Sequence, residues 1–238
     1  MFETNADLVS ARDDAHNRFI ALRIAQGRLD DAIRMMTGRP FAIIEGANLN
    51  TAEHWTTAHI RRAQLRIRAR DHQGALADLQ AAAAIPPNLP NPRALGFDSG
   101  GDARAPEIAY WTGVTYDAMH DAQQAAREWR KGAAAEAMKS RRPPQSNPAR
   151  DAERSYYRAL CMAKLQDAAP AKAIFESLIE AGAKPASPGR AGSAAALYIA
   201  ALGQAGLGET ENAVASLNEA LRISPDLAGA RTLLGVLR

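Results

Sequence analysis

The chain has 238 residues, of which 47% are hydrophobic, 23% charged and only 5% aromatic, and its formal net charge is +3. This composition is ordinary for a folded globular protein and argues against disorder as the main state. Its single cysteine, Cys161, excludes an internal disulfide and any cysteine-based metal cluster. The basic residues are spread thinly along the sequence, so we expect no nucleic-acid partner.

The first residues, MFETNADLVSARDD, lack the basic-then-apolar layout of a signal peptide, and no apolar run reaches 18 residues. We therefore expect a cytoplasmic protein with no membrane partner. If the chain is a C-terminal fragment of a longer protein, an upstream signal would be missing from it.

A recurring pattern of small residues predicts five helical hairpins. The clearest match to the tetratricopeptide pattern G-x2-Y…A-x3-F consists of Gly113, Tyr116, Ala125 and Trp129. The small residue at the hairpin crossing recurs at Ala32, Ala75, Ala125, Ala171 and Ala213. Small side chains at these positions let two helices cross closely, and a larger residue four positions later fills the space between adjacent hairpins.

The repeat pattern predicts an all-α, tetratricopeptide-like right-handed solenoid in a single domain over 1–238. Its hairpins are expected at approximately 6–40, 52–86, 106–140, 151–183 and 191–225, with a C-terminal capping helix over 226–238. Pro-, Gly- and Asn-rich connections separate the hairpins, because such segments cannot continue a helix. The glycine-rich stretch 203–208 fits an inter-helix turn, since no strand precedes it as a nucleotide-binding loop would require.

The segments 156–182 and 196–231 resemble the C-terminal region of bacterial proteins that join an N-terminal β-rich domain, likened to sugar-active enzymes, to tetratricopeptide repeats. The resemblance covers roughly residues 12–235. It extends to a loop at Phe41–Asn48 and another at 87–90, although the loop tryptophan and second glycine pair of those proteins are missing here. It implies either a stand-alone version or a C-terminal piece of a larger protein.

In this repeat type, the first helix has a tryptophan position, and the two residues that directly follow it are expected to face a concave groove. Together with neighbouring cations, they give the predicted binding residues Arg18, Arg61, Tyr110, Trp111, Tyr156, Tyr157, Lys164 and Tyr198. Tyrosines beside cations suit a peptide or an extended polar ligand. The alternative is that these aromatic side chains pack against neighbouring hairpins and close the groove.

Two loops supply further candidates for a second site, namely Glu45, Asn48, Asn88 and Arg93. Helix capping and turn geometry are the alternative roles for such residues.

No catalytic residue is nominated, and no metal or cofactor site. Cys161 lies in an apolar helical run, where a buried thiol is normal and a low-pKa nucleophile is not. His54 and His59 are five residues apart, which does not suit a zinc pair on a helix. No acid–base pair stands out, and Asp30 and Asp31 are expected to interact with solvent or a helix N-terminus.

The sequence therefore favours a non-catalytic scaffold that binds a protein or peptide partner. The alternatives are an accessory module of a carbohydrate-related enzyme, or a module that binds a small molecule or glycan directly. The oligomeric state does not follow from the sequence.

Overall fold

The computed structural model describes residues 12–41, 50–90, 104–135, 147–184 and 190–237, and all regular structure in them is helical. The helices are α2 (Asp13–Ala25), α3 (Leu29–Thr37), α4 (Thr51–Arg68), α5 (His72–Ala83), α6 (Ala105–Ala118), α7 (Ala122–Ala134), α8 (Pro148–Lys164), α9 (Ala168–Ala183), α10 (Arg190–Gly206), α11 (Thr210–Ile223) and α12 (Ala228–Leu237). The all-α prediction is confirmed. None of these helices is both long and apolar enough to cross a membrane.

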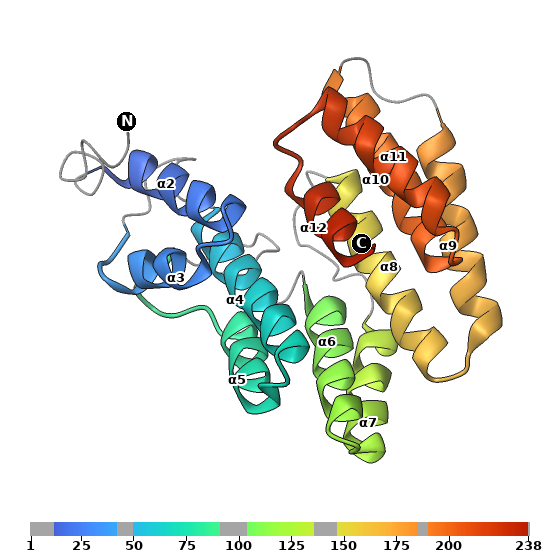
Figure 1. Cartoon of the computed structure of the whole chain (residues 1–238), viewed down its shortest axis with the longest axis horizontal. Coiled ribbons are helices and arrows are strands. Elements are labelled where there is room, and N and C mark those ends of the chain that lie inside the picture. The colour runs from blue at the N-terminus through green and yellow to red at the C-terminus, as the bar shows by residue number, and fades with distance from the viewer. Residues whose placement is uncertain (1–11, 42–49, 91–103, 136–146, 185–189, 238) are drawn as a thin grey trace, which may run out of the picture. The chain divides into compact units, whose positions relative to one another are not determined.

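The chain forms two compact units, and the boundary between them falls within α7. Unit 1 contains residues 1–125 and 136–144, and unit 2 contains residues 126–135 and 145–238. In unit 1, α2 packs on α3 and α4 packs on α5, while in unit 2, α8 packs on α9 and α10 on α11 (Figure 1). Helices that follow each other in sequence therefore pair as hairpins. A single domain over 1–238 stays a prediction.

The five turns between paired helices share one backbone geometry in the described part of the chain. Each contains a residue with positive φ placed five residues before the crossing alanine, and these residues are Gly27, Arg70, His120, Gln166 and Gly208. In each turn the next residue donates its N–H to the carbonyl five positions back, as Asp71 does to Arg66 and Asp167 to Met162. This bond satisfies a carbonyl that the helix end leaves open. The turn is therefore part of the repeat, although its residue type varies.

The predicted crossing positions form the core. The five alanines are at most 2% exposed, and the residues four positions later are at most 7% exposed: Met36, Leu79, Trp129, Phe175 and Leu217. Unit 2 has one large apolar cluster that joins residues of α8, α9, α10, α11 and α12. Unit 1 has two smaller clusters, one around Ile20, Met36 and Trp55 and another around Ile60 and Leu79.

The interpretation of 203–208 as a turn is wrong for its first part. Gly203 and Gly206 lie inside α10, and only Gly208 has the positive φ of the turn. A Cβ at Gly203 would lie 2.4 Å from the carbonyl oxygen of Phe175, and one at Gly206 would lie 2.1 Å from its ring. Both glycines therefore serve the close approach of α9 and α10, a packing role that a short glycine-rich sequence does not distinguish from a turn.

Replacing Gln166 by glycine should stabilise the protein, because the left-handed conformation costs a residue with a Cβ about 1–2 kcal/mol and glycine's entropy offsets about 0.5–1 kcal/mol of that gain.

Gly208→Ala should lower the free energy of unfolding by about 1 kcal/mol, since no neighbour lies within 4 Å of the new Cβ and only backbone strain changes. Urea unfolding of both variants measures this. Destabilisation by Gln166→Gly would contradict the shared turn geometry.

Candidate functional site

A buried group of charged side chains joins the helices of unit 1. His59, Arg62 and Arg66 lie on α4 at spacings of three and four residues, which places them on one face of the helix. Asp78 lies on α5, the other helix of the same hairpin. These four residues are called the Asp78 cluster.

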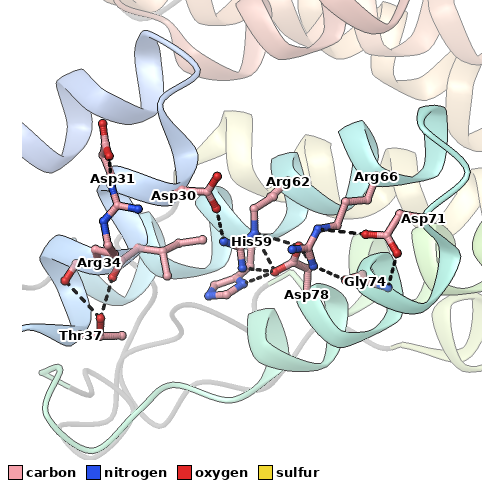
Figure 2. Close-up of polar contacts among 11 residues, drawn as sticks. Asp30, Asp31, Arg34, Thr37, His59, Arg62, Arg66, Asp71, Gly74 and Asp78 are labelled. Carbon is pink, nitrogen blue, oxygen red and sulfur yellow. Dashed lines mark hydrogen bonds and ion pairs between the residues drawn. The ribbon is translucent and has the colours of Figure 1, made fainter.

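Both carboxylate oxygens of Asp78 accept hydrogen bonds from α4 (Figure 2). His59 Nδ1 lies 2.7 Å from Oδ1, and Arg62 Nη2 lies 2.6 Å from the same oxygen. Arg62 Nε donates to Oδ2 at 3.0 Å, and Arg66 Nη1 is also 3.0 Å from Oδ2. Since an ionised carboxylate only accepts, His59 donates from Nδ1 and its Nε2 carries the other lone pair when the ring is neutral.

The Asp78 cluster is tied to its surroundings by further polar contacts. Arg62 Nη1 lies 2.5 Å from Asp30 Oδ1, which links the cluster to the preceding hairpin. Arg66 Nη1 donates to the carbonyl of Gly74 at 2.8 Å, and its Nε is 3.5 Å from Asp71. Asp71 is the N-cap of α5 and accepts from the backbone N–H of Gly74 at 2.9 Å. The network therefore connects α3, α4 and α5.

The cluster is buried and electrostatically paired. Asp78 is 1% exposed and His59 is 4% exposed. Burial alone would raise the pKa of Asp78, but the hydrogen bonds from His59 and Arg62 and the charges of both arginines hold it below its usual value. The bond to Asp78 raises the pKa of Arg62 in turn. Asp78 is therefore ionised at neutral pH.

The geometry suits a structural clamp better than catalysis. A His–Asp pair is a component of many hydrolases, where the aspartate orients the histidine and a nucleophile lies at the other nitrogen. Here both oxygens of Asp78 are engaged by arginines, and His59 packs against the ring of Trp55 with centroids 4.2 Å apart. His59 Nε2 is buried and has no hydrogen-bond partner within the described residues. Those residues also contain no group of three His, Cys, Asp or Glu placed to hold a metal ion.

The sequence pattern did not indicate this cluster. Asp30, which was expected to interact with solvent or a helix N-terminus, is exposed in the first turn of α3, and it also pairs with Arg62. A signal was present, because His59 occupies the tryptophan position of the repeat and Arg66 the position of Tyr116. A charged residue at a repeat position that is normally aromatic and buried indicates that an opposite charge pairs with it in the interior. The partner, Asp78, could not be identified from one sequence.

In unit 1, two of the four predicted groove residues, Arg61 and Trp111, contact a neighbouring hairpin. Arg18 is exposed. Arg61 is half-buried and donates to the carbonyl of Ile24 at 2.6 Å, at the end of α2. Tyr110 and Trp111 meet edge to face, and Trp111 packs against the apolar cluster of α4 and α5.

In unit 2, the predicted tyrosines lie largely in the core. Tyr156 is 7% and Tyr198 3% exposed, and the half-buried Tyr157 packs against the same cluster. The Tyr198 hydroxyl donates to Glu153 at 2.7 Å. Lys164 is exposed, with its ammonium 5.3 Å from the centre of the Trp129 ring. The packing alternative thus describes Tyr156 and Tyr198, and a binding role for the set stays a prediction.

Of the loop candidates, Glu45, Asn48 and Arg93 lie outside the described residues. The side-chain amide of Asn88 donates to the carbonyls of Met36 at 2.8 Å and Arg39 at 2.9 Å. These bonds satisfy carbonyls at the end of α3. The contacts of Asn88 are thus those of a capping residue, and ligand binding by the loops stays a prediction.

Replacing Asp78 by asparagine should lower the free energy of unfolding at pH 7 by about 1.5–3 kcal/mol, because the half-buried guanidinium groups of Arg62 and Arg66 lose the buried carboxylate that both contact. The difference from wild type should shrink with acid. The folded-state pKa of Asp78 lies below the reference value of 3.8, so its stabilisation is present above that value and is lost as the pH falls through the folded pKa.

Urea unfolding between pH 7 and pH 3 measures this, with Asp71→Asn as the matched control. Asparagine is an equally good N-cap, and the Asp71 ion pair is exposed, so the control should lose at most about 1 kcal/mol. Equal losses in both variants would mean that Asp78 is not a buried clamp.

Cys161 should react with a thiol reagent such as DTNB only when the protein unfolds. The side chain is 0% exposed, and burial raises its pKa to about 12, so almost no thiolate exists at pH 8. Stopped-flow absorbance in native buffer and in urea measures the rate. Fast reaction in native buffer would show that the expected buried, inert thiol is wrong.

No family model and no curated protein matches this chain. Among solved structures, it is similar to one described as the crystal structure of YrrB, a TPR protein with an unusual peptide-binding site. The sequence identity is 16%, the match covers 98% of this chain and 94% of that chain, and the TM-score is 0.32. Because the two chains do not superpose as wholes at this score, the match gives no argument about what this chain binds. Its own paired helices, turns and crossing alanines make it an all-α, tetratricopeptide-like repeat of helical hairpins.

Proposed function

We propose that the chain is a non-catalytic scaffold that binds a protein or peptide segment through unit 1. The observation that carries this proposal is a repeated pair of an arginine and an exposed leucine on α2 and α4. Arg18 and Leu22 are four residues apart, and so are Arg61 and Leu65, so each pair shares one helix face. We call these four residues the Arg/Leu surface.

The two pairs occupy equivalent positions in consecutive repeats, ten residues before the crossing alanines Ala32 and Ala75 in the case of the leucines. Leu22 is 37% and Leu65 51% exposed. The equivalent residues of the later hairpins are buried in each case: Thr115, Cys161 and Gly203. The first two hairpins therefore leave a leucine open at a position that the later hairpins bury, and this repeated exposure suits an interaction site.

The chemistry of the Arg/Leu surface favours a segment that combines apolar and acidic side chains. The guanidinium of Arg18 is exposed and suited to a carboxylate, while Leu22 and Leu65 offer apolar contact. Arg61 is engaged with the carbonyl of Ile24 and so fixes α4 against the end of α2. The partner is thus expected to span two hairpins.

Two alternatives have less support. Glycan binding by a tyrosine stripe requires exposed rings, whereas Tyr156 and Tyr198 are buried. The other alternative is an accessory module of a carbohydrate-related enzyme, next to an N-terminal β-rich domain. Only the sequence resemblance supports it. Cytoplasmic localisation and the lack of nucleic-acid, membrane and cofactor binding stay predictions.

Site-specific photo-crosslinking tests the proposal. A benzophenone amino acid at position 65 should crosslink a partner in cell extract, and Arg18→Glu in the same chain should reduce the product at least about tenfold, because carboxylates on the partner would be repelled. The matched control places the crosslinker at Ala173, an exposed residue of α9 in unit 2. Equal products from positions 65 and 173, or a yield unaffected by Arg18→Glu, would overturn the proposal.

A further inference from the structure

The order of side chains along the Arg/Leu surface follows from how α2 and α4 lie against each other. His54 Nδ1 lies 2.9 Å from Asn17 Oδ1, and Arg61 donates to the carbonyl of Ile24 at 2.6 Å. In both pairs the residue on α4 has a number 37 higher than its neighbour on α2. The two helices therefore run parallel, with this register between them.

At this register the exposed side chains of the surface form a row with a cation at one end. Arg18 comes first, Leu22 lies about 6 Å further along α2, and Leu65 lies about 15 Å beyond Arg18 along the axis. Since the axes of packed helices are about 8–10 Å apart, Arg18 and Leu65 are separated by roughly 17 Å. A segment that covers the whole row must therefore place an acidic and an apolar side chain about that far apart.

The segment before α2 has the composition that this row calls for. Residues 1–11 lie outside the described residues, and their sequence is MFETNADLVSA. It contains two carboxylates, Glu3 and Asp7, no basic side chain, and apolar side chains that include Phe2. The segment thus has the charge opposite to that of Arg18 and apolar side chains for the exposed leucines.

The length of the segment fits the row as well. Asp7 is five residues from Arg12, which directly precedes α2, and Arg18 lies about 9 Å along α2 from Arg12. Five residues span up to about 17 Å, which is enough for the chain to reverse and bring Asp7 to Arg18. The five residues from Asp7 back to Phe2 span up to the same distance of about 17 Å, so Phe2 then reaches Leu65.

We propose that residues 1–11 fold back over the Arg/Leu surface and cover it until a partner segment with acidic and apolar side chains displaces them. In this closed state Asp7 pairs with Arg18, and Phe2 packs on Leu65. The inference rests on the proposed function, because it regulates the same surface by competition within the chain. A tethered segment acts at an effective concentration on the order of 1 mM, so it covers the surface about nine-tenths of the time when its own Kd is about 0.1 mM.

A crosslinker in place of Phe2 tests the contact directly. In the full chain with a benzophenone amino acid at position 2, irradiation should join this residue to α4 within one monomer, and mass spectrometry locates the joined residue. Arg18→Glu should reduce the product at least about fivefold, because it repels Asp7. The matched control is Arg127→Glu, which makes the same change at an exposed residue of α7 and should leave the yield unchanged.

Competition for the surface is measured with a fluorescein-labelled peptide of residues 1–11, followed by fluorescence anisotropy. A full chain that carries Glu3→Lys and Asp7→Lys should bind this peptide at least about tenfold more tightly than wild type does, because its own segment no longer covers the surface. The matched control carries Glu176→Lys and Glu180→Lys, the same two charge reversals at exposed residues of α9. It should bind the peptide as weakly as wild type does.

The proposal fails if position 2 crosslinks elsewhere in the chain or only between monomers, or if Arg18→Glu leaves the product unchanged. It also fails if the peptide binds wild type and the variant with both lysines equally, or binds neither at concentrations up to about 1 mM. In all these cases a partner can still crosslink at position 65. Conversely, residues 1–11 can cover the surface when no partner is captured there, so the two proposals can fail separately.

Discussion

The close crossing of two helices in each hairpin is the constraint on which the rest of the structure depends. A buried alanine permits the approach, and a turn with one left-handed residue five positions earlier fixes where the second helix begins. Because short turns and small side chains set this geometry locally, the surrounding positions can vary widely. The position four residues after the crossing alanine is therefore a methionine, Met36, in one hairpin and a tryptophan, Trp129, in another.

That freedom explains how unit 1 tolerates charge in its interior. His59 and Arg66 occupy positions where the repeat usually has aromatic residues, and Asp78 neutralises the site from the other helix of the hairpin. Charges inside a protein are acceptable only when they are paired and hydrogen-bonded. The cluster orients α3, α4 and α5 with directional bonds in place of apolar packing. Specific geometry is thus obtained there from electrostatics, whereas unit 2 obtains it from a larger apolar cluster.

Most of the fold could be predicted from the sequence, since the crossing alanines and the breaks between hairpins are local signals. The candidate site could not, for two physical reasons. The pairing of Asp78 with α4 depends on which faces of two helices meet, which periodicity alone does not determine. The burial of Tyr156 and Tyr198 depends on how the hairpins of unit 2 pack on one another, which a pattern within one hairpin does not determine. Arg18 and Arg61 could be named because they follow the same position of the repeat, and their binding role stays a prediction.

The Asp78 cluster adds a polar link to the apolar packing between the first two hairpins of unit 1. The apolar cluster around Ile20 and Met36 reaches α4 through Trp55 and Ala58, and the bond from Arg62 to Asp30 connects the same two hairpins. The first hairpin is therefore held on α4 by two kinds of contact, so weakening either one leaves the other to keep the hairpin in register.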